Sequence, residues 1–221
     1  MIATAIDSLN AAFADICVSF KVCEERTIEN FQYDSIDSLA QWEDLLVKEH
    51  QPNRINIFLV TSSVLDPVSP QEECGFATPS GIASLETGGM VMHKECLALP
   101  DVLIHLAGHY FGLIHTFEGN GSEFVNGSNC ASEGDLICDT PADNYLPPSN
   151  IFNNNWIDRQ ETCRFINAET DDNQEFYRPH VGNYMSYYFD AATGFTCRCG
   201  FSHQQYLKMA ETYSSSDPKM W

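Results

Sequence analysis

The sequence predicts a protein of the α+β class, with a mixed sheet and two helices in an upper half and a loop-rich lower half that ends in a helix. Residues up to about 118 alternate between helical and strand-like hydrophobic patterns, whereas residues 120–155 are dense in Asn, Gly, Ser, Asp and Pro. The chain has 221 residues, of which 43% are hydrophobic, which is enough for one packed domain. We therefore expect a single domain over 1–221, with an upper subdomain at 1–118, a lower subdomain at 119–221 and a cleft between them.

The elements of the upper half are predicted from hydrophobic periodicity. Residues 6–13 place apolar side chains on one helical face, and 53–60 form a nearly continuous apolar run that suits a buried strand. In chain order we expect a helix at 6–13, a strand at 16–23, a helix at 35–47, a central strand at 53–60, turns at 62–89, an edge strand at 88–97, and a helix that begins near Pro100 with Asp101 as its N-cap. Near the end of the chain, 202–213 have a helical pattern.

The charge of the chain excludes some partners. There are 31 acidic and 11 basic residues, a formal net charge of −20. This charge argues against nucleic acid and anionic membranes, and no apolar run is long enough to span a bilayer. It fits a protein that meets cations, basic peptides or calcium-rich surroundings, although a solvated acidic surface explains most carboxylates equally well.

Nine cysteines indicate an exported protein, because disulfides form in oxidising compartments. The odd number leaves at least one thiol free or paired outside the chain. The first residues lack the pattern of a signal peptide, so we expect that a signal lies upstream of a truncated chain or that export is unconventional. The pairing cannot be deduced from spacing, but candidates for disulfides in the lower half are Cys130, Cys138, Cys163 and either Cys197 or Cys199.

A metal site is predicted from three histidines. His105 and His109 stand at i and i+4, so on a helix their imidazoles point the same way. Gly112 can adopt the left-handed conformation that ends a helix, and the chain can then return His115 to the same ion. Three histidine ligands suit zinc and leave a fourth position open. The alternative is a core helix with incidental histidines. We expect ordinary surface or hydrogen-bonding roles for the other four, His50, His93, His180 and His203.

The segment "HLAGHYFGLIHTFEG" resembles the extended zinc motif of metzincin metallopeptidases. The "HTF" ending, "GDLICDTP" at 134–141, "NYMSY" at 183–187 and "FSHQQYLKM" near the end together resemble the pappalysin family. The resemblance runs from about residue 6 to 209 and implies a metzincin-like catalytic domain, with a twisted mixed sheet and two long helices above the cleft. A strand that such domains have before the first helix is missing, which again suggests truncation.

The resemblance also implies roles for individual residues. The three histidines would bind zinc, and Met185 would lie beneath the metal as the methionine-turn residue without coordinating it. The Tyr187 hydroxyl would stabilise the oxyanion formed when water attacks a peptide carbonyl. Asp135 and Thr140 would contribute to a structural calcium site, whose ligands are hard oxygen donors. The alternative for this last loop is an Asx-type turn without an ion.

The sequence departs from the family at Leu106. Related peptidases carry there a glutamate that takes a proton from zinc-bound water and passes it to the leaving amine, and leucine can do neither. The nearest carboxylate, Glu118, we expect on a surface loop. The resemblance thus implies a secreted zinc endopeptidase fold that acts on extended polypeptides, with hydrolysis impaired or absent. The acidic surface, and Asp190 just past the methionine turn, indicate a preference for basic side chains in the substrate.

Two alternatives remain from other classes. The first is a non-catalytic zinc-containing module that binds a peptide or protein partner. The second is a disulfide-rich structural domain without metal.

Overall fold

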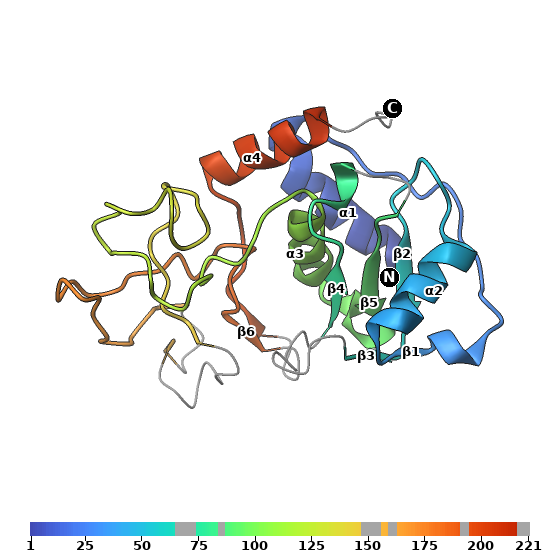
Figure 1. Ribbon diagram of the computed structural model, residues 1–221, viewed down its shortest axis with the longest axis horizontal. Helices are drawn as coiled ribbons and strands as arrows, with labels where there is room; N and C mark the ends of the chain where they lie inside the picture. Colours follow the sequence, from blue (N-terminus) through green and yellow to red (C-terminus); the bar gives the residue numbers. More distant parts are fainter. Residues whose placement is uncertain (65–73, 84–86, 147–155, 159–162, 191–194, 216–221) are drawn as a thin grey trace. The chain divides into compact units, whose positions relative to one another are not determined.

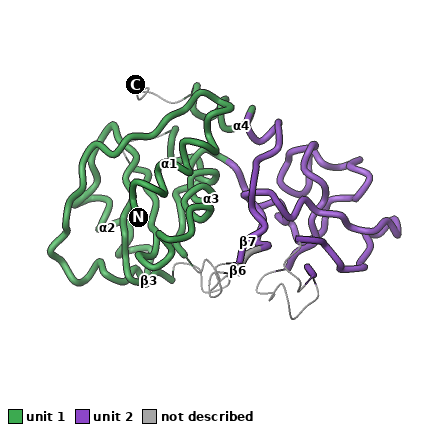
Figure 2. The backbone as a smooth tube through the Cα atoms, turned by 180° about the vertical axis from the view of Figure 1, so that it is seen from behind, with its two compact units in different colours: residues 1–112, 207–221 green, residues 113–206 purple. Residues whose placement is uncertain are grey.

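The computed structural model describes residues 1–64, 74–83, 87–146, 156–158, 163–190 and 195–215 (Figure 1). The chain divides into two compact units, which are coloured separately in Figure 2. Unit 1 contains Met1–Gly112 and Leu207–Trp221, and unit 2 contains Leu113–Tyr206. The boundary follows Gly112 directly, within the segment that carries the three histidines. The organisation as one domain divided at residue 118 stays a prediction.

Unit 1 is built on a mixed three-stranded sheet of order β2-β5-β4. β2 (Ile57–Val60) pairs in parallel with β5 (Met90–His93), and β4 (Gly75–Ala77) pairs antiparallel on the other side of β5. All four residues of β5 are buried. The prediction of an edge strand at 88–97 is therefore wrong: an apolar run without alternation suits a central strand, and Lys94–Ala98 forms a 3-10 helix instead. A second, two-stranded parallel sheet joins β1 (Ser35–Ile36) to β3 (Ser62–Ser63).

Helices lie on both faces of the β2-β5-β4 sheet (Figure 1). α2 (Leu39–Glu49) packs Trp42 edge-on against Phe58 of β2 and Phe76 of β4, with ring centroids 5.7 and 5.2 Å apart. α1 (Ile2–Phe13) and α3 (Pro100–Tyr110) contact each other, and α3 also contacts β4 and β5. Because it is covered by sheet and helix, α3 has nine buried residues of eleven, and its histidines are held on a rigid element.

Local chemistry explains where the predicted boundaries were wrong. Residues 16–23 do not form a strand: Ile16 ends a 3-10 helix (Ala14–Ile16), and the backbone N–H and carbonyl of Phe20 bond to the Asn10 side chain of α1, which replaces a strand partner. Asp101 is not the N-cap of α3 but lies in its first turn, because the helix starts at Pro100. α2 starts later than predicted, since the Ser38 hydroxyl accepts a hydrogen bond from the Gln41 N–H as N-cap.

Unit 2 is rich in loops, as predicted. Its strands β6 (Phe189–Asp190) and β7 (Phe195–Thr196) form one antiparallel pair, and α4 (His203–Ser214) begins in it. Disulfides stabilise it at Cys130–Cys138 and Cys163–Cys197, and unit 1 contains a third at Cys74–Cys96. Of the two alternatives for the partner of Cys163, the structure selects Cys197. The free thiols among the described residues are those of Cys17, Cys23 and Cys199. The remaining short 3-10 helices are Phe31–Tyr33 and Gly81–Ala83.

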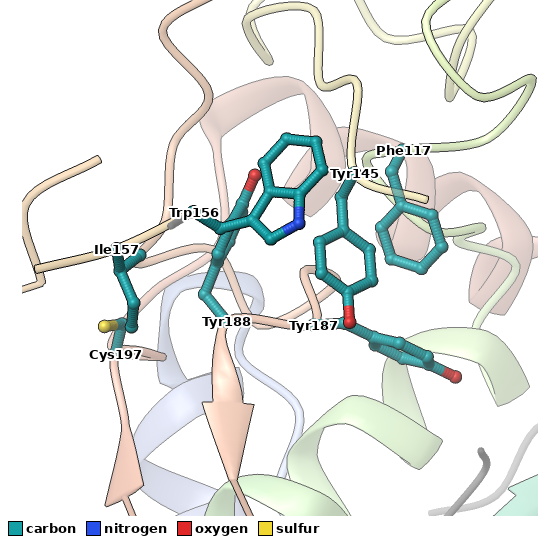
Figure 3. Packing of buried hydrophobic residues seen from close by; sticks show 7 residues of the cluster. All are labelled: Phe117, Tyr145, Trp156, Ile157, Tyr187, Tyr188 and Cys197. Atoms are coloured by element: carbon teal, nitrogen blue, oxygen red, sulfur yellow. The ribbon is translucent and has the colours of Figure 1, made fainter. Parts of the chain in front are cut away.

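A cluster of aromatic rings forms the core of unit 2 (Figure 3). Tyr145 lies between Phe117 and Trp156, with ring centroids 5.2 and 5.6 Å away, and it also packs on Tyr187 and Tyr188. Rigid rings that pack on several neighbours can order a unit that has little regular secondary structure. Among the described residues, no helix combines the length and the apolar composition that crossing a membrane requires.

Candidate metal centre

α3 places two imidazoles together. The Nε2 atoms of His105 and His109 are 3.1 Å apart, and the rings stand edge to face at an interplanar angle of 89°. Two nitrogens bound to one tetrahedral zinc at about 2.0–2.1 Å lie about 3.4 Å from each other. The observed separation is close to that value, so the pair fits two positions of a zinc shell without a change of the helix.

Gly112 ends α3 in the way the sequence predicts. Its φ is +94°, a left-handed conformation that side chains rarely adopt, and its N–H donates to the His109 carbonyl at 2.9 Å. A Cβ at this position would lie 2.8 Å from Thr212 Oγ1 and 3.2 Å from Ser80 Oγ. Glycine is therefore required for conformation and for space, and the chain leaves the helix here towards His115.

The third histidine joins the first two. One ring nitrogen each of His105, His109 and His115 lie within 4.8 Å of one another. A second cluster among the described residues, His93 with Glu95 and Cys96, lacks a thiolate because Cys96 is bonded to Cys74. The three histidines are thus the group in the described part of the chain whose chemistry fits zinc.

The other histidines have ordinary surroundings. The imidazole of His50 bonds to the Gly88 carbonyl at 3.1 Å, and that of His93 to the Ser63 hydroxyl at 2.8 Å. His180 and His203 are exposed.

Aromatic rings in unit 2 hold the His115 imidazole. It stacks on Phe117 with an interplanar angle of 11° and meets Tyr187 edge-on, each at a centroid distance of 4.7 Å. Figure 3 shows Tyr187 at one end of the aromatic cluster, with its hydroxyl pointing away from Tyr145 and Trp156. The position beside His115 agrees with the place that the predicted role of Tyr187 needs, and the role itself stays a prediction.

The segment around Met185 is a tight, buried turn. The Met185 carbonyl accepts from the Thr116 N–H at 3.2 Å, so the turn is joined to the residue that follows His115. The Met185 N–H donates to Asn183 Oδ1 at 2.8 Å, and the Asn183 amide donates to Gln205 Oε1 at 2.8 Å. Met185, Asn183 and Gln205 are all fully buried. These bonds set the shape of the turn at Met185, and its role as the methionine turn stays a prediction.

Two residues that support the histidine group could not be recognised from the sequence, and the first is Asp143. Its buried carboxylate accepts from the Thr116 hydroxyl at 2.9 Å, the Tyr188 hydroxyl at 2.8 Å and the Tyr145 N–H at 3.0 Å. Burial raises the pKa of Asp143 to about 6, although these three donors oppose the rise. No motif marks Asp143, since its partners are far away in sequence or belong to the backbone.

The second of these residues is Arg198. Its guanidinium donates from Nε and one terminal nitrogen to the Ser186 carbonyl, at 2.9 and 2.6 Å, and lies 5.8 Å from the centre of the Tyr187 ring. Arg198 is 7% exposed, which is rare for arginine. It therefore fixes the carbonyl of the turn directly before Tyr187.

Leu106 follows His105 on α3 and is buried, with 3% of its surface exposed. The side chain carries no group that accepts or donates a proton. Glu118 is exposed, as predicted for a surface loop position. That a general-base carboxylate is missing at position 106 stays a prediction from the resemblance.

The loop with Asp135 and Thr140 has the geometry of an Asx turn. Asp135 Oδ1 accepts from the Ile137 N–H at 3.0 Å and from the Thr140 hydroxyl at 2.8 Å. Beside it, Glu123 is 4% exposed and its carboxylate packs against Gly134. Burial and mutual repulsion with nearby carboxylates raise the pKa of Glu123 to about 7, and burial raises that of Asp135 to about 7. Glu123 lies outside the "GDLICDTP" block, so no motif in the sequence points to it.

The proteins that the chain is similar to in sequence are metalloproteinases. No family model matches the chain. It is 28% identical over 121 residues, 51% of its length, to mouse (Mus musculus) "A disintegrin and metalloproteinase with thrombospondin motifs 18", and 30% identical over 98 residues, 42% of its length, to the human (Homo sapiens) protein of that name. The matched regions span 10% and 8% of these relatives.

Among solved structures, mirolysin in complex with compound 9 is similar over 99% of this chain and 85% of its own, with a TM-score of 0.61 and 16% identity. This likeness confirms the predicted α+β fold as that of a metallopeptidase. Together with the relatives and the histidine group, it supports a zinc metallopeptidase fold for the chain.

Proposed function

We propose that the protein is a secreted, pappalysin-type member of the metzincins that binds zinc through His105, His109 and His115 and binds extended peptides. We further propose that its peptide-bond hydrolysis is strongly impaired. One observation carries the proposal: three imidazole nitrogens lie within 4.8 Å of one another, while the residue after the first histidine is a buried leucine. The disulfides and the metalloproteinase relatives support secretion and a peptide or protein partner.

The chemistry follows from what the residues can and cannot do. Bound zinc would polarise a peptide carbonyl and lower the pKa of a water molecule. The Tyr187 hydroxyl would donate to the oxyanion, positioned by His115 on one side and by the Arg198-bound turn on the other. Leu106 cannot accept the proton of the attacking water. General acid–base help is worth typically 10²–10⁴-fold, so its loss raises the barrier by about 3–5 kcal/mol.

We also propose a structural calcium ion in unit 2, at Asp135 and Thr140 as expected from the resemblance, with Glu123 as an additional oxygen donor. The support is chemical: two buried carboxylates without a basic partner in the described hydrogen bonds and ion pairs repel each other, and a divalent cation with oxygen ligands would remove that repulsion. A preference for basic residues in the substrate, suggested by the net charge of −20, belongs to the same proposal.

The alternative function is a zinc-containing module that binds a peptide or protein without cutting it. The same leucine favours it. The two functions differ only in whether zinc-assisted hydrolysis without a general base is fast enough to matter.

The experiment compares the protein with Leu106→Glu and with Leu106→Gln, which has the shape of glutamate without its charge. Zinc content is measured by elemental analysis, and cleavage of a peptide library rich in Lys and Arg is followed with and without a chelator. We expect one zinc per chain in all three, with chelator-sensitive cleavage at least 100-fold faster in Leu106→Glu than in the other two. Absence of zinc from the folded protein would refute the metal site.

Two other results separate the alternatives. Chelator-sensitive cleavage by the unaltered protein at the rate of Leu106→Glu would show that another group replaces the glutamate. Peptide binding without cleavage by any of the three would favour the binding module.

A further inference from the structure

Unit 2 contains an open cavity of about 590 Å³ whose lining residues do not belong to the candidate metal centre. Its lining includes two aromatic residues, Trp156 and Tyr177, and three acidic residues, Glu169, Asp171 and Asp172. None of the three histidines lines it, and neither does Tyr187 or Met185. A cavity of this size accommodates a small organic molecule or a side chain and is far larger than a single ion.

The cavity has an unbalanced negative charge. The described residues that line it include three carboxylates and no lysine, arginine or histidine. The effect reaches Tyr177, whose hydroxyl donates to the Gly121 carbonyl at 2.9 Å: burial raises its pKa, and the charges of Asp171, Asp172 and Glu169 raise it further. An uncompensated field of this sign attracts cations.

The carboxylates are not equally available to a ligand. Asp171 accepts from the N–H groups of Val125, Asn173 and Glu175, each at 2.9 Å, so its role is to shape the loop. Glu169 accepts one bond, from the Asn144 amide at 2.8 Å, and both Glu169 and Asp172 are exposed. Glu169 and Asp172 therefore have oxygens that can accept from a ligand.

Among the described residues, two buried polar atoms of the cavity lining have no hydrogen bond. They are Asn144 Oδ1 and the indole nitrogen of Trp156, and these residues are 8% and 5% exposed. Buried polar groups in native proteins are nearly always paired, so an unpaired acceptor at a cavity indicates a donor that the bound state supplies. The Asn144 amide nitrogen also donates to the Glu169 carboxylate. The acceptor oxygens of Asn144 and Glu169 are therefore fixed relative to each other on this wall of the cavity.

The geometry argues against a metal ion as the occupant. Among the described residues, the acidic groups of this cavity do not form a set of three ligand atoms within 4.8 Å of one another. Acceptor oxygens beside aromatic rings instead match a cation with delocalised or multiple N–H donors, which also interacts favourably with the face of tryptophan or tyrosine.

We propose that this cavity is a binding site for an organic cation with a guanidinium or ammonium group, held by Glu169 and Asp172, with Asn144 as a further acceptor and Trp156 and Tyr177 as aromatic walls. The site does not depend on the proposed zinc chemistry. The same group can arrive as a free polyamine or as a basic side chain of a peptide, and the probes must distinguish these sources.

The test is isothermal titration calorimetry of the full chain at low salt with spermidine and with a capped pentapeptide that contains one arginine. The variant Glu169→Gln/Asp172→Asn removes two charges from the cavity, and the glutamine that replaces Glu169 keeps an acceptor for the Asn144 amide. The control variant Glu133→Gln/Glu175→Gln removes two charges from exposed residues of unit 2 that do not line the cavity. Circular dichroism checks that all variants fold.

We expect saturable binding of at least one probe with one site per chain. The cavity variant should weaken the Kd about tenfold and the control variant less than twofold. Stronger binding of spermidine indicates a free polyamine, and stronger binding of the peptide indicates a protein side chain.

Three results overturn the proposal. Equal weakening by both variants would mean general attraction to an acidic surface. Binding of a neutral disaccharide in place of both cations would assign the cavity to hydroxyl recognition. Calcium binding that is lost only in the cavity variant would make it a metal site.

Discussion

Replacing Gly112 by alanine tests whether the turn after α3 positions the third histidine. Gly112 has a φ of +94°, and the third candidate ligand, His115, comes after Leu113 and Ile114 in the chain that leaves the helix. An added methyl group changes neither charge nor any hydrogen bond of this residue. Its effect is therefore limited to backbone conformation and to the space beside Thr212 and Ser80.

The magnitude has two parts. A left-handed conformation costs a non-glycine residue about 1–2 kcal/mol. The new Cβ would also lie 2.8 Å from Thr212 Oγ1, which is held by its bond to the Lys208 carbonyl at 2.9 Å, so the helix side chain must rotate and give up that bond. This second part is worth about 1 kcal/mol. We expect Gly112→Ala to lower the free energy of unfolding by roughly 2–3 kcal/mol.

The matched control is Gly127→Ala. Gly127 also has a positive φ, +69°, but a Cβ there meets nothing within 4 Å. It should lose only the conformational part, about 1 kcal/mol. Combining Gly112→Ala with Thr212→Ala removes the obstructing hydroxyl and should recover about 1 kcal/mol, which a double-mutant cycle measures. Urea unfolding of the zinc-free protein gives these values, and competition with a chromogenic chelator gives the zinc affinity.

Zinc affinity is the decisive readout. If the turn places His115, the zinc Kd of Gly112→Ala should rise at least about tenfold, a loss of about 1.4 kcal/mol, whereas that of Gly127→Ala should not change. Equal zinc affinity in all variants would refute the positioning role of Gly112. Equal destabilisation by Gly112→Ala and Gly127→Ala would refute the steric part.

Two further predictions concern the buried carboxylates of unit 2. Calcium at about 100 times its Kd should raise the free energy of unfolding by about 2.7 kcal/mol, and magnesium should raise it less. The variants Asp135→Asn and Glu123→Gln should lose most of this stabilisation. An equal effect of the two ions would argue against the calcium site. For Asp143, burial raises the pKa from 3.8 to about 6, so the folded state holds its proton more tightly than the unfolded state, and stability falls as the pH rises from about 4 to 6. The isosteric Asp143→Asn should remove roughly 3 kcal/mol of this decline in urea unfolding, and an unchanged slope would contradict the assigned cause.

Local patterns in the sequence predicted the parts of the structure that depend on neighbours along the chain. The spacing of His105 and His109 and the position of Gly112 follow from helix geometry. The apolar run at 53–60 formed a strand only at Ile57–Val60, and the prediction that it is central was wrong, because β2 lies at the edge of the β2-β5-β4 sheet. The same reasoning failed at 16–23, where a β-rich composition met a competing partner, the side chain of Asn10. Propensity describes a segment alone, and one side chain with two hydrogen bonds to the backbone was enough to override it.

Long-range partners could not be predicted in this way. Cys163 pairs with Cys197 and leaves Cys199 free, although the two candidates are only two residues apart. The spacing of the cysteines does not distinguish Cys197 from Cys199 as the partner, because the pairing depends on which of them lies next to Cys163 in the folded unit. That arrangement is a property of the whole unit and leaves no mark on the local sequence.

The support of the candidate centre depends on such long-range contacts more than the ligands do. Thr116, next to His115, is held through its N–H by Met185 and through its hydroxyl by Asp143. Asp143 also holds Tyr188, and the chain between Met185 and Tyr188 contains Tyr187, which packs against His115. These contacts form a closed loop that returns to the histidine, so displacement of any one member strains the others.

This closed arrangement bears on the meaning of Leu106. The buried Asp143 carboxylate costs stability at neutral pH, and its three hydrogen bonds position the segment that follows His115. Asp143 contributes nothing to the metal ligands, yet it orients the segment that carries His115 at the expense of its own raised pKa. The three histidines and this costly support fit the proposed metal site, and the proposed effect of Leu106 concerns only whether a bond is cut there.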